Sequence, residues 1–177
     1  MFYRSALCVG AALLTSIPAG ALAADVVACD LFDEPAISAL VGVKLKSSMN
    51  RHKQVANDAT ISACIFRADR HSVRVTLWEY ASETVAATRY EAALDNTKRE
   101  KTIGNVHIQY MVDGNYGIGD KSYWYQLASE QFGVTVLKSN RVLVVNFQFA
   151  DRVSGSNTGP RLKHRGRPVF QSALRKL

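Results

Sequence analysis

Residues 60–80 read TISACIFRADRHSVRVTLWEY and predict an antiparallel β-hairpin. The segment from Thr60 to Ala68 is apolar and β-branched, and the segment from Ser72 to Tyr80 alternates between apolar and polar residues, as a strand with one buried face does. The short Asp69-Arg70-His71 connection joins the two strands. Alternation divides the second strand into an apolar face with Val73, Val75 and Leu77, and a second face with Arg74, Thr76, Trp78 and Tyr80.

Three helices are predicted around this hairpin. Asp33-Glu34-Pro35 begins a short helix that Gly42 ends, because it supplies an N-cap residue and then a proline in the first turn. Ser82 caps the longest helix, at about residues 83–99, whose apolar residues recur at helical spacing. Pro168 begins the third helix, near the C-terminus.

Further strands complete the predicted fold. We expect an edge strand at residues 43–49, a loop at 50–58, and a Gly-rich turn at 113–120. Four strands are expected after the long helix, at residues 106–112, 123–127, 132–138 and 142–149. The predicted class is therefore α+β: a mainly antiparallel sheet of about six strands, with three helices packed on it and one disulfide.

The N-terminus has the pattern of a cleaved secretory signal. Arg4 supplies a positive charge, an apolar run of about a dozen residues follows, and Ala21-Leu22-Ala23 fits a signal peptidase site. Because a membrane-spanning helix needs about 20 apolar residues, we predict a signal peptide at 1–23. Residues 24–177 would then form a single α+β domain, with a basic loop and terminal helix at 152–177. This domain would be periplasmic or secreted.

Cleavage would remove Cys8 and leave Cys29 and Cys64 in an oxidising compartment. We predict a disulfide between them. Two free buried thiols or a metal pair are the alternatives, although a zinc site needs more than two ligands. A further alternative is lipidation, because Val26-Val27-Ala28-Cys29 also fits a lipobox. Cys29 would then anchor a lipoprotein and leave Cys64 without a partner.

Positive charge is concentrated near the C-terminus. Residues 25–151 carry 14 Lys and Arg against 15 Asp and Glu, whereas residues 152–177 carry seven against none. Such a cluster suits an anionic polymer or lipid, and a solvated terminus is the alternative. The residues predicted to contact an anion are Arg161, Lys163, Arg165 and Arg167.

No catalytic, cofactor or metal motif is recognisable. The four histidines show no metal-binding spacing, and no Gly-x-Ser-x-Gly sequence is present. Gly117 and Gly119 precede a predicted strand rather than a helix, so we interpret them as a turn and not a phosphate-binding loop. We therefore predict no catalytic residues, no cofactor and no metal.

Aromatic residues gather in the predicted sheet. The residues that could form a stacking platform for bases or sugars are Trp78, Tyr80, Tyr123, Trp124 and Tyr125, interleaved with Arg74 and Lys121. Trp78, Tyr80 and Trp124 are the candidate ligand surface, and ordinary sheet packing is the alternative. Alternation puts Tyr123 and Tyr125 on the face opposite Trp124, so at most part of this set is exposed together.

A family resemblance rests on several short motifs. Cys29-Asp30-Leu31-Phe32, a short helix ended by Gly42, and Cys64-Ile65-Phe66 resemble a group of exported bacterial domains of unknown function, best represented among actinobacterial lipoproteins. Gly117-Ile118-Gly119-Asp120 resembles a second element of that pattern. The resemblance implies a bond between the two cysteines and an α+β domain of the extracytoplasmic sensor type that presents a cleft. It implies no established catalytic residues.

The predicted function is a non-catalytic exported binding or sensor-like module of unknown ligand. The absence of a recognisable acid, base and nucleophile set and the resemblance both favour this interpretation. The alternative is a periplasmic interaction protein that acts as an inhibitor or immunity factor for a partner protein. An enzyme whose active site is assembled only in the fold is the third interpretation.

Overall fold

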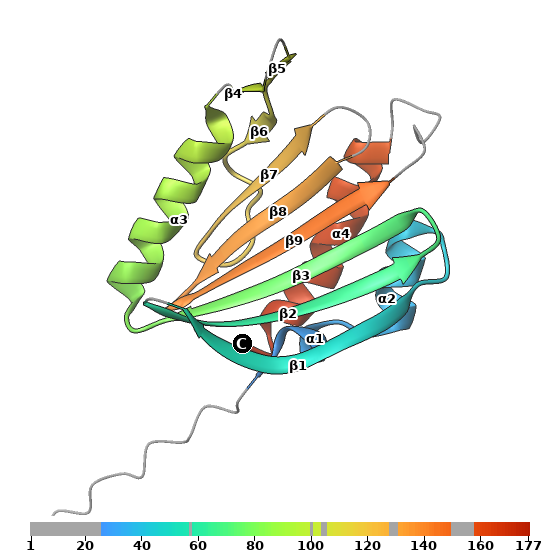
Figure 1. The fold of residues 1–177 in the computed structure, drawn as a ribbon, viewed down its shortest axis with the longest axis horizontal. Helices are drawn as coiled ribbons and strands as arrows, with labels where there is room; N and C mark the ends of the chain where they lie inside the picture. The colour runs from blue at the N-terminus through green and yellow to red at the C-terminus, as the bar shows by residue number, and fades with distance from the viewer. Residues whose placement is uncertain (1–25, 57, 100, 104–105, 128–130, 150–157) are drawn as a thin grey trace, which may run out of the picture.

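The computed structural model describes residues 26–177, except 57, 100, 104–105, 128–130 and 150–157. The predicted signal peptide, and residues 152–157 of the predicted basic loop, lie outside this description. One seven-stranded antiparallel sheet dominates the structure, with strand order β1-β2-β3-β9-β8-β7-β6 (Figure 1). The predicted α+β class is confirmed.

The strands of this sheet are β1 (Lys46–Ala56), β2 (Ala59–Ala68), β3 (His71–Tyr80), β6 (Met111–Asp113), β7 (Lys121–Leu127), β8 (Gln131–Lys138) and β9 (Arg141–Phe149). A separate small hairpin consists of β4 (Lys101–Ile103) and β5 (Val106–Ile108). The helices are α1 (Ala28–Leu31), α2 (Glu34–Val41), α3 (Glu83–Lys98) and α4 (Thr158–Leu174).

The sheet has two faces with different coverings. We call the face covered by α1, α2 and α4 the inner face, and the face crossed by α3 the outer face (Figure 1). Along β3, the predicted apolar residues Val73, Val75 and Leu77 are buried on the inner face. The alternation of this strand therefore directs Arg74 and Trp78 to the outer face.

Two predicted helices begin and end as their sequences indicate. Asp33 caps α2, because its side chain accepts a hydrogen bond from the main-chain N–H of Ala36 at 2.7 Å. Gly42 ends that helix in the left-handed region, with φ of +82°, where a glycine is favoured. Ser82 caps α3 by accepting a hydrogen bond from the main-chain N–H of Val85.

The disulfide predicted from two cysteines is present. Cys29 in α1 is bonded to Cys64 in β2, and the two Cα atoms lie 5.0 Å apart. Next to it, the main-chain N–H of Ala28 donates to the buried hydroxyl of Ser62 at 2.9 Å. The bond and the hydrogen bond together hold the start of the described chain against the inner face.

The loop predicted at residues 50–58 is wrong. Instead, β1 continues to Ala56 and pairs with β2, with a register shift between Asn50 and Gln54. This strand is the edge of the sheet, and an edge strand tolerates polar and basic residues because one side of it faces solvent. The sheet has seven strands, and the predicted strand at 106–112 is divided between β5 of the small hairpin and β6 of the large sheet.

The third helix begins ten residues earlier than predicted, at Thr158 rather than Pro168. Its buried side includes Gly159, Leu162, Gly166 and Phe170, which recur at helical spacing, but two glycines in this row hide the pattern. Pro168 lies inside the helix and is exposed, so it removes a main-chain hydrogen bond within the helix but does not mark its start.

Candidate functional site: a groove on the outer face

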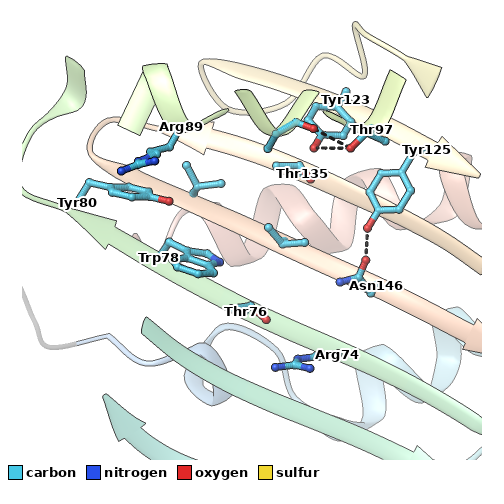
Figure 2. A pocket seen from close by; sticks show the side chains of 13 residues that line it. Arg74, Thr76, Trp78, Tyr80, Arg89, Thr97, Tyr123, Tyr125, Thr135 and Asn146 are labelled. Atoms are coloured by element: carbon cyan, nitrogen blue, oxygen red, sulfur yellow. Dashed lines mark hydrogen bonds between the residues drawn. The ribbon is translucent and has the colours of Figure 1, made fainter. Parts of the chain in front are cut away.

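A groove of about 470 Å³ lies between α3 and the outer face of the sheet (Figure 2). Helix α3 crosses only part of this face, so outward side chains of β3, β7, β8 and β9 line the groove. Those that matter most here are Arg74, Trp78, Tyr80, Tyr123, Tyr125 and Asn146. The groove is therefore both aromatic and polar.

One end of the groove is formed by two aromatic rings of β3. The rings of Trp78 and Tyr80 are nearly parallel, with an interplanar angle of 8° and centroids 6.4 Å apart. Tyr80 is largely buried and Trp78 is half-buried. The ring of Trp78 thus offers a flat apolar surface to the groove (Figure 2).

The opposite wall contains two tyrosines of β7. Thr97 of α3 donates its hydroxyl proton to the carbonyl of Ala93 at 2.8 Å, so the contact of 3.4 Å between Thr97 and the Tyr123 hydroxyl places Tyr123 as the donor. The Tyr125 hydroxyl donates to Oδ1 of Asn146. Burial, followed by the neighbouring tyrosines, raises the pKa of Tyr125, which keeps this phenol protonated as a donor.

Two arginines line the groove, and they differ in whether they have an acidic partner. Arg89 of α3 is paired with Asp58, with Nη2 2.7 Å and Nε 2.9 Å from Oδ2 of the carboxylate. Arg74 on β3 is exposed and has no hydrogen bond or ion pair within the described part of the chain. Its charge is consequently available to the groove.

A second cavity, of about 370 Å³, adjoins the first along the outer face. The two share Arg74, Tyr125 and Asn146, and the second is also lined by Arg67 of β2. Among the described residues that line either cavity, none is Asp or Glu. The junction of the two cavities is therefore positively charged.

The structure separates the three aromatic residues predicted as a ligand surface. Trp78 and Tyr80 line the groove together. Trp124 does not: it is 4% exposed and packs on the inner face against Tyr116, Phe132 and Phe147. The reason is the alternation of β7, which turns Tyr123 and Tyr125 outward and Trp124 inward.

Asn146 and Arg67 were not predicted as site residues. The signal for Asn146 lies in the sequence of β9, where Asn146 and Gln148 interrupt the apolar residues at 142–149 at alternate positions. Alternation within β7 places Tyr125 outward, but its hydrogen bond to Asn146 depends on Gly133 in the neighbouring strand.

The four basic residues predicted to contact an anion also divide into two pairs. Lys163 forms an ion pair with Asp113, and Arg167 lies 5.5 Å from the ring centroid of Tyr116. Arg161 and Arg165 are exposed on the opposite side of α4. Arg167 is also exposed, and Lys163 and Arg167 line a cavity of about 490 Å³, so anion binding by either pair stays a prediction.

Metal ligands do not gather within the described residues: no group of three or more His, Cys, Asp or Glu is close enough to hold an ion. No helix in the described part of the chain is both long and apolar enough to cross a membrane. His71 packs edge-on against Phe149, with ring centroids 5.3 Å apart, which is a packing role.

The fold and the groove define an α+β domain with an antiparallel sheet, helices on both faces and an aromatic cavity under one helix. No family model and no curated protein matches the chain. One similar solved structure is the extracellular domain of PknH from Mycobacterium tuberculosis, at 12% sequence identity and a TM-score of 0.47, covering 82% of this chain and 94% of that one. The resemblance to actinobacterial lipoproteins stays a prediction.

Proposed function

We propose that this protein is an exported, non-catalytic binding or sensor-like module that holds a small ligand in the groove under α3. The observation that supports the proposal is the groove itself, which combines a flat indole, three tyrosines and an unpaired arginine in about 470 Å³. Small-molecule sites have volumes of about 300–1,000 Å³ and place a few polar groups among apolar ones.

Export is supported by the disulfide. Disulfides persist in secreted and periplasmic proteins and are rare in the cytosol, and Cys29 is bonded to Cys64. The signal-like pattern at residues 1–23 is consistent with the same location.

The absence of catalysis is part of the proposal and is supported by the composition of the groove. General acid–base or nucleophilic catalysis in water needs a titratable group near neutral pH or an activated nucleophile. The described residues that line the groove include no His, Cys, Asp or Glu.

The test uses two neighbouring alanines of α3. Ala93 lines the groove, whereas Ala92 is exposed. Phenylnaphthylamine, an uncharged probe that fluoresces in apolar sites, should bind the wild-type protein with one-to-one stoichiometry. Ala93→Phe fills the groove and should abolish this binding, while Ala92→Phe should leave it unchanged.

Thermal unfolding of both variants shows that each is folded. Equal binding by the two variants, or no binding by the wild-type protein, would contradict the proposal, because the groove would then not be the site.

A further inference from the structure

We infer that the ligand of this groove is an organic anion with a flat apolar body, and that Arg74 and Asn146 hold its anionic group. This inference rests on the proposed function and adds the chemical class of the ligand. The groups that recognise the anion lie at the junction of the two cavities, and the surface that receives the apolar body lies at Trp78.

The register of the sheet brings the two polar residues together. Arg74 in β3 lies directly opposite Asn146 in β9, and both side chains are on the outer face (Figure 2). Residues paired in this way have Cβ atoms about 4.5–5.5 Å apart, which is close enough for both side chains to contact one small group.

The orientation of Asn146 makes it a donor toward the cavity. Its Oδ1 accepts the hydrogen bond from the Tyr125 hydroxyl. An asparagine amide has its oxygen and its NH₂ group on opposite sides, so this contact leaves the two N–H donors free. A guanidinium group and an amide NH₂ group side by side are all donors, and an oxyanion is the ligand group that accepts from both.

The charge of the surroundings favours the same ligand. Arg67 of β2 lies on the same face as Arg74, because Ile65 is the residue opposite Arg74 and Arg67 is two positions further along β2. Neither Arg67 nor Arg74 has an ion pair within the described residues. Two unpaired arginines without a lining carboxylate attract an anion and repel a cation.

The distance between Arg74 and Trp78 along β3 indicates where the apolar part of the ligand would lie. Trp78 is four residues from Arg74, which is about 13 Å along an extended strand. Thr76 lies between them and lines the groove, and its small side chain leaves this part of the groove open. A flexible arginine side chain spans several Å of that distance, so one small molecule can contact the guanidinium group and the indole ring at once.

Two probes with the same ring system test the inference. Anilinonaphthalene sulfonate is phenylnaphthylamine with one sulfonate added, so the difference between their affinities measures recognition of the anionic group. The sulfonate probe should bind the wild-type protein about tenfold or more tightly than the neutral probe, as hydrogen bonds to a charged group imply. Added NaCl should weaken binding of the sulfonate probe and leave binding of the neutral probe unchanged.

The substitution that carries the test is Arg74→Gln. It should remove the advantage of the sulfonate probe while binding of the neutral probe stays the same. The matched control is Arg165→Gln, which removes the same charge from an exposed position on α4, behind the sheet. It should leave both affinities unchanged.

The possible results separate the inference from the proposed function. If both probes bind equally well and Ala93→Phe abolishes both, the ligand class is wrong but the groove remains a binding site. If Arg74→Gln and Arg165→Gln lower the affinity for the sulfonate probe equally, the effect is due to net charge and the inference is wrong. If neither probe binds the wild-type protein, both proposals are overturned.

Discussion

The ring of Tyr125 lies directly over Gly133 of the neighbouring strand, and a Cβ atom built on Gly133 would be 2.2 Å from its Cζ. Gly133 is the residue opposite Tyr125 in the pairing of β7 with β8, and it is also opposite Asn146 in the pairing of β8 with β9. Because Gly133 has no side chain, the tyrosine can reach across β8 to bond Asn146. One glycine thus determines the wall of the groove.

Substitution of this glycine should destabilise the protein. Gly133→Ala forces the ring of Tyr125 to move, and overpacking of this kind costs about 1–3 kcal/mol. We expect thermal unfolding to shift down by a few degrees and binding of the sulfonate probe to weaken. Gly114→Ala is the control, because no atom lies within 4 Å of a Cβ at that position.

A double variant identifies the cause. If Tyr125 is the residue that clashes, Gly133→Ala combined with Tyr125→Ala should cost less than the sum of the two single losses. Strict additivity would show that the clash is not the origin of the effect.

Loss of the disulfide should lower the free energy of unfolding substantially. Cys29 and Cys64 are separated by 35 positions, and closure of a loop of that size contributes roughly 4 kcal/mol in the chain-entropy description. Urea unfolding with and without a reductant measures the change. A variant with both cysteines changed to Ala should resemble the reduced protein and should not respond to the reductant, and a response would point to another reducible bond.

Stability should decrease in acid partly through Glu79. Burial alone would raise the pKa of this carboxyl, but the hydrogen bond and charge of Arg141, with Lys53, hold the pKa below its ordinary value of 4.5. A carboxyl with a lowered pKa stabilises the fold above its unfolded-state pKa, and this contribution disappears as the pH falls through the folded-state pKa.

The corresponding comparison is wild type against Glu79→Gln. The variant should be less stable at neutral pH, since Arg141 is only 8% exposed and would lose a charged partner. Below about pH 4.5 the difference between the two should become smaller. Urea unfolding at a series of pH values gives this difference, and a constant gap would exclude Glu79 as the titrating group.

The basic residues of α4 should behave as two classes. Changing Arg161 and Arg165 to Gln should lower retention on a polyanion column and leave the unfolding temperature unchanged, because both residues are exposed. Changing Lys163 and Arg167 to Gln removes the same charge but also the contacts with Asp113 and Tyr116.

Substitution of Lys163 and Arg167 should therefore lower the free energy of unfolding by about 1 kcal/mol, or the unfolding temperature by a few degrees. Its effect on retention should be smaller. Equal loss of retention in the two variants would show that the polyanion responds to net charge and not to a defined face of α4.

Local signals in the sequence predict much of this fold. Asp33 and Ser82 mark helix starts because each supplies a hydrogen bond to a free main-chain N–H, and this interaction is complete within a few residues. The β2–β3 hairpin is equally local. The beginning of α4 was not predictable in this way, because Gly159 and Gly166 are buried by contacts with Gln126, Phe132 and Phe170 rather than by their own hydrophobicity.

The candidate site was predictable only in part. Alternation along β3 places Arg74, Trp78 and Tyr80 on one face, and this can be seen in the sequence. The position of Asn146 opposite Arg74 depends on the pairing of β3 with β9, two strands separated by α3 and five other strands in the chain. Such a register is decided by the packing of the entire sheet, so no short segment contains it.

The inner layer joins residues from the two ends of the described chain. Lys176 donates to the carbonyl oxygens of Asp30 and Leu31, and Phe170 packs against Phe32. The core beneath the sheet therefore cannot close until α4 has been synthesised, and contacts at such long sequence separation make folding slow. A nascent chain that stops before α4 would leave the part of the inner face that α4 covers exposed, so the core can be completed only after nearly the whole chain has been made.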